Sequence, residues 1–285
     1  MTSKRIRIVC ISDTHNHAPG EGYTLPQGDI LIHAGDLTNQ GSYKELKKAV
    51  DWISSADFAV KIIVAGNHDL SLDSDYSLKH ESGWKVLPED VEACRGLMRS
   101  DQFIYLEHSS VVVQLPEKDV TLRVFGSPYS PDRGRQNWAF QYADDTATSL
   151  WNEVPQDTDV LIIHTPPKGF CDESRHWEQG GCAALAKTLL RIKPLVHICG
   201  HCHEGRGARI VEWDGEGPAS SNAARVWSDA SAGTKKVSKL DLSELKPGRE
   251  TAIVNASIMA TSHGHGGKIY NKPIVMKLHV AAAGA

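Results

Sequence analysis

The sequence has no apolar run long enough to cross a membrane and no excess of basic residues. Lys and Arg together number 31 against 35 Asp and Glu, which gives a formal net charge of −4. A membrane span needs about 20 consecutive apolar residues, and a nucleic-acid partner requires a basic face. We therefore expect neither a membrane nor a standing nucleic-acid partner, and the sequence leaves the oligomeric state open.

Cysteine is sparse and scattered. Several of the six cysteines stand within apolar runs, as is typical of buried free thiols rather than of a secreted disulfide framework. The apolar run behind Lys4, Arg5 and Arg7 ends at Ser12 and is too short for the hydrophobic segment of a secretory signal. These features predict a cytoplasmic protein.

The composition that is present is typical of one folded domain. Apolar residues make up 40% of the chain and charged residues 23%, as in ordinary globular proteins, and there is no internal repeat. We therefore expect a single domain over residues 1–285. Apolar alternation predicts hairpins at 110–130 and between 208–215 and 251–257, and the Gly-, Ser-, Ala- and Lys-rich stretch near 214–248 predicts a surface insertion.

Five short runs rich in Val and Ile have the length and composition of buried strands. After the second run, Leu46, Val50 and Ile53 recur at helical spacing behind an S-x-x-E capping box at 42–45. Further helices are predicted near 143–154 and 182–193. Strands that alternate with helices indicate an α/β fold. The five runs are 5–15, 29–38, 60–69, 159–167 and 194–203.

Each of these five runs ends in side chains that can bind a metal ion. Because the carboxyl ends of strands in an open α/β sheet face one crevice, we expect these side chains to converge. A mixture of imidazole, carboxylate and one amide oxygen suits Mn, Fe or Zn and needs no thiolate. The predicted ligands are Asp13, His15, Asp36, Asn67, His164, His201 and His203.

In this order, the five short motifs resemble those of the calcineurin-like metallophosphoesterases. The chain resembles in particular the branch of the brain metallophosphoesterase-domain proteins, relatives of class III cyclic-nucleotide phosphodiesterases. The resemblance implies a four-layer sandwich of two mixed β-sheets flanked by helices. The motifs are D-x-H at 13–15, G-D at 35–36, G-N-H-D at 66–69, H-T-P-P at 164–167 and G-H-x-H at 200–203.

The resemblance also implies two divalent metal ions and a mechanism. A hydroxide that bridges the ions would attack phosphorus, His68 would protonate the leaving oxygen, and Asp69 would orient the His68 imidazole. Some relatives have glycine at the position of His201, so the histidine here predicts a complete second site. One ion would be held by Asp13, His15, Asp36 and His203, and the other by Asp36, Asn67, His164 and His201.

The predicted function is therefore the hydrolysis of small phosphodiesters such as cyclic nucleotides. Two alternatives stay open: a nucleotide-binding or scaffold protein with little turnover, and a dinuclear metalloenzyme recruited to non-phosphate chemistry. Trp138 and Phe140 are candidates for an apolar wall, and His263 and His265 for a loop that borders the pocket. The candidate phosphate contacts are His17, Arg133, Arg135 and Arg206.

A competing pattern overlaps the last motif. Cys199, Cys202 and His203 form a C-x-x-C-H, which is also the attachment pattern of c-type haem. However, Cys199 belongs to an apolar strand, and Cys202 alternates with the two histidines and should point away from them. We therefore expect two buried thiols that take no part in the chemistry.

Overall fold

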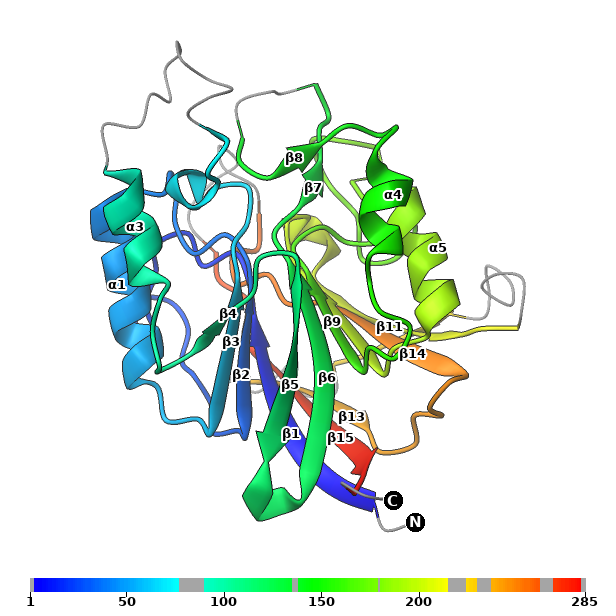
Figure 1. The fold of residues 1–285 in the computed structure, drawn as a ribbon. Coiled ribbons are helices and arrows are strands. Elements are labelled where there is room, and N and C mark those ends of the chain that lie inside the picture. Colours follow the sequence, from blue (N-terminus) through cyan, green and yellow to red (C-terminus); the bar gives the residue numbers. More distant parts are fainter. Residues whose placement is uncertain are drawn as a thin grey trace.

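A computed structural model describes residues 3–76, 90–134, 138–178, 180–214, 224–229, 237–261 and 269–282 of the chain. Two large mixed sheets face each other and carry helices on their outer sides (Figure 1). The α/β class and the two-sheet architecture are therefore confirmed. The first sheet runs β13 (Ser238–Leu242), β15 (Ile274–Ala281), β1 (Ser3–Ile11), β2 (Ile30–Ala34), β3 (Val60–Val64) and β4 (Ile104–Tyr105).

The second sheet has seven strands, and a short two-stranded pair lies beside it. The pair consists of β7 (Ser130–Pro131) and β8 (Gln141–Tyr142). The order of the second sheet is β12 (Ala224–Val226), β11 (Gly207–Glu212), β14 (Glu250–Asn255), β10 (Val196–Cys199), β9 (Val160–Ile163), β6 (Val120–Ser127) and β5 (Ser109–Leu115).

The main core fills the space between the two sheets. Ile6 and Ile8 of β1 belong to the same buried cluster as Val124 of β6 and Ile162 of β9. Each is at most 2% exposed, and burial of one such side chain stabilises the fold by about 1.5–3 kcal/mol. The strand ends are thereby fixed relative to one another across both sheets.

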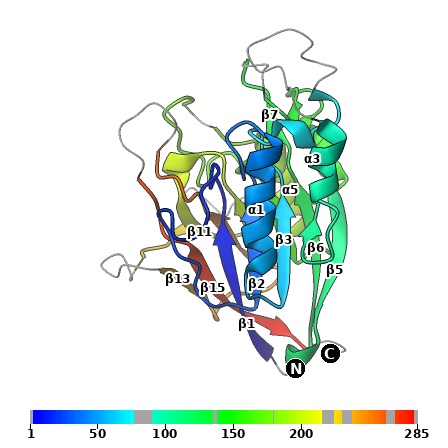
Figure 2. The same cartoon turned by 90° about the vertical axis from the view of Figure 1, so that its left-hand side faces the viewer.

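Helices cover the outer face of each sheet. Figure 2 shows α1 (Tyr43–Ser55) and α3 (Val91–Leu97) against the first sheet, and α4 (Ala147–Asn152) and α5 (Ala183–Ile192) cover the second. The predicted capping box at the start of α1 is confirmed, since Ser42 and Glu45 bond each other's backbone amides. Among the described residues, no helix has the length and apolar character needed to cross a membrane.

The segment 214–248, expected to be an insertion, contributes strands to both sheets. β12 pairs with β11, and β13 pairs in parallel with β15. Leu240 and Leu242 of β13 are buried in the main core, because the strand alternates its side chains between core and solvent. The predicted hairpins are confirmed as antiparallel pairs, β5 with β6 and β11 with β14.

Candidate metal centre

The loops after five strands bring the predicted ligands together at one end of the two sheets. Those after β1, β2 and β3 come from the first sheet, and those after β9 and β10 from the second. Four ligands have left-handed backbone conformations, with φ of 51° at Asp13, 41° at His15, 55° at Asp36 and 65° at His201. Non-glycine residues rarely adopt this conformation, and strained backbone of this kind is concentrated at functional sites.

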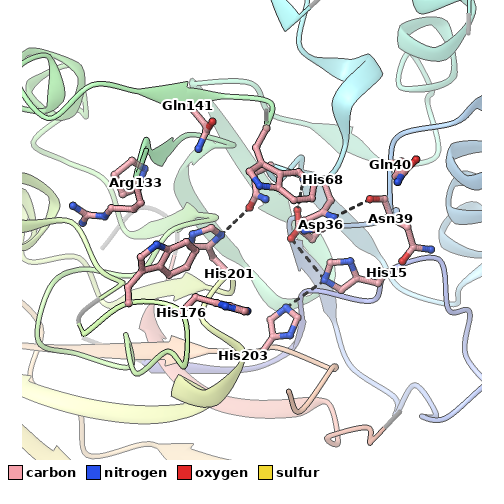
Figure 3. Close-up of a pocket in the computed structure, with 14 residues that line it drawn as sticks. His15, Asp36, Asn39, Gln40, His68, Arg133, Gln141, His176, His201 and His203 are labelled. Carbon is pink, nitrogen blue, oxygen red and sulfur yellow. Dashed lines mark hydrogen bonds and ion pairs between the residues drawn. The ribbon is translucent and has the colours of Figure 1, made fainter. Parts of the chain in front are cut away.

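Asp36 lies at the centre of the cluster (Figure 3). Its Oδ2 is 3.8 Å from Nε2 of His15, and its Oδ1 is 3.4 Å from Nε2 of His164. The side chain is 2% exposed. One carboxylate therefore offers an oxygen to each half of the cluster, which is the placement expected of a bridging ligand.

The first half of the cluster contains two imidazoles that face each other. Nε2 of His15 is 3.3 Å from Nε2 of His203, and the latter is 3.2 Å from Oδ1 of Asp13. Burial raises the pKa of Asp13, but the charge of His203 and its hydrogen bond lower it by more, so the carboxyl stays ionised far below its usual pKa. Three donor atoms therefore meet at one point.

The second half has an equivalent convergence around an amide. Nδ1 of His164 donates to the carbonyl of Ala34 at 2.9 Å, so Nε2 faces the cluster. Burial lowers the pKa of this imidazole, but the Asp36 carboxylate raises it by more, to about 9. That Nε2 lies 3.0 Å from Oδ1 of Asn67, and Nδ1 of His201 lies 2.7 Å from the same oxygen. Once Nε2 loses its proton, the nitrogen and the Asn67 oxygen present lone pairs to the same point, where a cation would bind both atoms.

The donor set therefore fits divalent metal ions. In three groups, the ligand atoms of every member lie within 4.8 Å of one another: Asp13 with His15 and His203, Asp13 with Asp36 and His164, and His15 with Asp36 and His68. All donors are nitrogen or oxygen, in keeping with a catalytic divalent ion rather than a structural thiolate site. The third group also brings His68 against the centre, although the sequence predicts it as a proton donor.

Two glycines are needed for this packing. A Cβ at Gly66 would overlap Oδ1 of Asp36, and a Cβ at Gly200 would overlap Oδ2 of Asp13 and Oγ of Ser12. The backbone passes so close to the carboxylates that only hydrogen fits. The glycines of the G-N-H-D and G-H-x-H motifs are therefore part of the site.

His68 and Asp69 lie next to each other in sequence but have different partners. Nδ1 of His68 donates to the carbonyl of Asn39 at 2.8 Å. The Asp69 carboxylate accepts from the amides of Thr38 and Gly66, at 2.9 and 2.8 Å, and from the Thr38 hydroxyl at 2.7 Å. Asn39 therefore orients the His68 imidazole, whereas the hydrogen bonds of Asp69 connect the loops after β2 and β3.

A pocket of about 340 Å³ opens above the cluster. The Trp138 ring packs on His68 with 4.0 Å between centroids, and the Trp177 ring stacks on His201 at 5.4 Å and 18°. Trp138 therefore forms a wall, as the sequence suggests, whereas Phe140 is buried in the core. Besides the cluster, the pocket is lined by Asn39, Gln40, Pro131, Arg133, Trp138, Gln141, His176 and Trp177.

Of the predicted phosphate contacts, Arg133 lines this pocket. His17 is outside the lining, with Nδ1 at 3.0 Å from the carbonyl of Thr14. Arg206 is also outside it, because its guanidinium donates to Ser238 and to the carbonyl of Lys272 and so supports the edge of the first sheet. Arg135, His263 and His265 lie outside the described residues.

Sequence reasoning missed the other pocket residues. Asn39 and Gln40 come from the loop after β2, just beyond the G-D motif, and Gln141 begins the short strand β8. His176 and Trp177 come from the long loop between β9 and α5. The dipeptide at 176–177, an imidazole beside an indole in a polar loop, is the one local signal. Its place beside His201 depends on how the loop folds back over the second sheet.

The segment V-N-A-S at 254–257, at the end of β14, supports the metal centre through hydrogen bonds. The amide of Asn255 donates to the carbonyls of Gly200 and Cys202, at 3.2 and 2.7 Å. The Ser257 hydroxyl donates to Oδ2 of Asp13 at 2.8 Å. Asn255 is fully buried, so its role is to hold the G-H-x-H turn and the first-strand carboxylate in place.

Both cysteines of the C-x-x-C-H pattern are buried free thiols. Cys199 is 0% and Cys202 is 1% exposed, and burial raises the pKa of each well above its ordinary value. A neutral thiol without solvent access is a poor nucleophile. The expectation of two thiols outside the chemistry agrees with this placement.

Comparisons with known proteins agree with the geometry. A protein of Emericella nidulans named probable rhamnogalacturonate lyase C is 42% identical over 215 residues, covering 75% of this chain and 18% of that protein. Human metallophosphoesterase domain-containing protein 1 is 36% identical over 70% of this chain, and a UPF0046 protein of Caenorhabditis elegans is 41% identical over 71%.

The chain spans less than a fifth of the fungal protein, and it covers 61% of the human and 65% of the worm relative. The family model described as calcineurin-like phosphoesterase matches residues 6–205, which hold every residue of the cluster. Because that match covers most of the chain and all five motifs, the chain belongs to the calcineurin-like phosphoesterase family.

Proposed function

We propose that this chain hydrolyses small phosphodiesters with the help of two divalent metal ions. The observation that carries the proposal is the position of Asp36, whose two carboxylate oxygens face His15 on one side and His164 on the other. When bound, two cations would supply Lewis-acid polarisation of the ester and a water of lowered pKa. Asp13, His15, Asp36 and His203 would hold one ion, and Asp36, Asn67, His164 and His201 the other.

His68 would act as the general acid that protonates the leaving group. With Nδ1 donating to Asn39, the ring has a fixed orientation beside Asp36, whose Oδ1 accepts from the His68 amide at 2.8 Å. A protonated His68 would give its second proton to the departing oxygen, which removes the charge that the leaving group would otherwise carry.

The walls of the pocket favour a diester over a monoester. A diester carries two organic groups and one negative charge, and the pocket offers two aromatic side chains, Trp138 beside His68 and Trp177 beside His201. Arg133 is the one permanently charged cation among the described residues that line it. A small diester with planar substituents, such as a cyclic nucleotide, fits this combination of apolar faces and modest positive charge.

The test pairs metal content with turnover. Wild type and Asp36→Asn are analysed for bound metal, and hydrolysis of bis(p-nitrophenyl) phosphate and of p-nitrophenyl phosphate is measured after Mn²⁺ addition. We expect near two ions per chain and faster diester turnover in wild type, with both lost in the variant. Two ions without turnover would instead favour a nucleotide-binding scaffold or a centre recruited to other chemistry.

A further inference from the structure

A second cavity adjoins the pocket. It has a volume of about 320 Å³ and is lined by the start of α5, by α4 and by the loop that carries Lys168. Arg133 lines both cavities. Arg133 thus stands at the boundary of both spaces, and a group attached to an ester in the pocket would reach the second cavity by passing this side chain.

Positive charge dominates this second cavity. Arg133, Lys168 and Lys187 line it, and Asp144 is the one carboxylate among its described lining residues. Asp144 lies 3.6 Å from Nη1 of Arg133 and is itself largely exposed. Within the described part of the chain, neither lysine has a carboxylate oxygen within 4.0 Å. Both lysines are exposed, so their solvated ammonium groups are available to an anion in the cavity.

Arg133 also carries an unsatisfied donor. Its Nη2 donates to the carbonyl of Gly181 at 2.8 Å, which fixes the guanidinium between the two cavities. Its Nε is buried and has no acceptor among the described residues. Because a buried donor without an acceptor destabilises a fold, an oxygen supplied by a ligand would stabilise this arrangement.

The second cavity lies across the pocket from the residue that anchors His68. In Figure 3, Arg133 lies on the opposite side of the pocket from Asn39 and Gln40. His68, the proposed proton donor, is anchored through Nδ1 to the carbonyl of Asn39, so the proton for the leaving group comes from Nε2 on the other edge of the ring.

We propose that Lys168, Lys187 and Arg133 bind an anionic group, a phosphate or a carboxylate, that is carried by an organic substituent of the substrate. This proposal rests on the proposed phosphodiesterase function. Charge-assisted hydrogen bonds from ammonium and guanidinium groups to an oxyanion are stronger than neutral ones and suit this chemistry. The preferred substrates would thus be diesters with a second negative group, rather than simple diesters.

The test compares two esters that differ by one phosphate. Thymidine 5′-(p-nitrophenyl phosphate) is measured with and without a 3′-phosphate. In wild type, we expect the 3′-phosphate to lower KM about tenfold, the gain of two or three partly exposed ion pairs. In Lys168→Gln/Lys187→Gln, this advantage should disappear, while kcat/KM for the ester without the 3′-phosphate stays within about twofold of wild type.

Lys239→Gln is the matched control, because it removes an exposed lysine from β13 that lines neither cavity. The proposal is overturned if this control loses the advantage equally, which indicates a general charge effect, or if wild type shows no advantage. Sulfate could instead change the hydrolysis of the ester without the 3′-phosphate in wild type but not in the double variant, while the 3′-phosphate gives no advantage. This result would overturn the proposal and indicate that the second cavity binds a free anion.

Binding is measured separately from hydrolysis, so that failure of the phosphodiesterase function can be recognised. The rise in Tm with thymidine 3′,5′-bisphosphate is compared with the rise with thymidine 5′-monophosphate. A larger rise with the bisphosphate in wild type, lost in the double variant, supports the anion cavity even if neither ester is hydrolysed. Equal rises in both proteins contradict it.

Discussion

The imidazole of His201 lies nearly parallel to the indole of Trp177, with 18° between the ring planes and 5.4 Å between the centroids. The same imidazole directs Nδ1 towards Oδ1 of Asn67 at 2.7 Å. A flat aromatic surface limits rotation of a ring that packs on it. Trp177 therefore fixes the direction of a nitrogen proposed to bind metal.

Replacement of Trp177 should weaken one half of the metal centre. We expect Trp177→Leu to lower the affinity for the second ion about 10–100-fold, as for other residues that orient a ligand. Trp177→Phe keeps an aromatic face and should restore most of the affinity. Calorimetric titration with the metal ion measures the affinity of each binding step in both variants. Two binding steps with unchanged affinity in Trp177→Leu would refute this role.

Glycine at 200 should be irreplaceable. In Gly200→Ala the new Cβ overlaps Asp13 and Ser12, and we expect a loss of about 1–3 kcal/mol in the free energy of unfolding together with loss of bound metal. Gly96→Ala in α3 is the control, because nothing lies within 4 Å of its Cβ. It should gain about 0.5–1 kcal/mol. Urea unfolding distinguishes them, and equal stability of the two variants would count against the close-approach argument.

His68 should matter most for esters with a poor leaving group. p-Nitrophenolate departs without a proton, whereas an alkoxide needs one. We expect His68→Gln to reduce kcat about 10²–10⁴-fold for a dinucleoside monophosphate, and far less for bis(p-nitrophenyl) phosphate. Steady-state kinetics on both esters give the comparison. Equal losses would instead assign His68 to metal binding, as its proximity to His15 and Asp36 allows.

Asp69 should contribute to stability more than to proton transfer. Its carboxylate accepts hydrogen bonds from Thr38 and from the amides of Leu37 and Gly66. Asp69→Asn turns one acceptor oxygen into a donor that faces amide hydrogens. We expect a loss of about 1.5–3 kcal/mol in unfolding free energy. In the metal-loaded variant that remains folded, the pH dependence of kcat should match wild type, and a shifted profile would restore the predicted link to His68.

The acid sensitivity of the fold should depend on His197. Burial lowers the pKa of this imidazole to about 3, against about 6.5 in the unfolded chain. The unfolded state therefore binds the proton first. The contribution of His197 to stability is fully present above pH 6.5 and is lost as the pH falls towards 3. Between pH 7 and pH 5, wild type should lose about 2 kcal/mol more than His197→Gln. Urea unfolding at the two pH values checks this, and parallel losses would contradict it.

Strands and ligand positions follow from the sequence because both have local signals. Continuous Val and Ile runs predict buried strands, and β1, β2, β3, β9 and β10 form where the five runs stand. The rule that strand ends share one crevice is enough to bring residues as distant as Asp13 and His203 together. β15 was missed although its side chains alternate between core and surface.

The sequence by itself determined the family motifs, the strand framework and the set of side chains at its ends. Only the tertiary structure decided what surrounds them: that Asn39 rather than Asp69 holds His68, that Trp177 stacks on His201, and that Arg133 stands between two cavities. The physical reason is how far apart in the sequence the interacting residues lie. Apolar periodicity acts within one element, whereas a hydrogen bond or ring stack between loops depends on how both sheets pack.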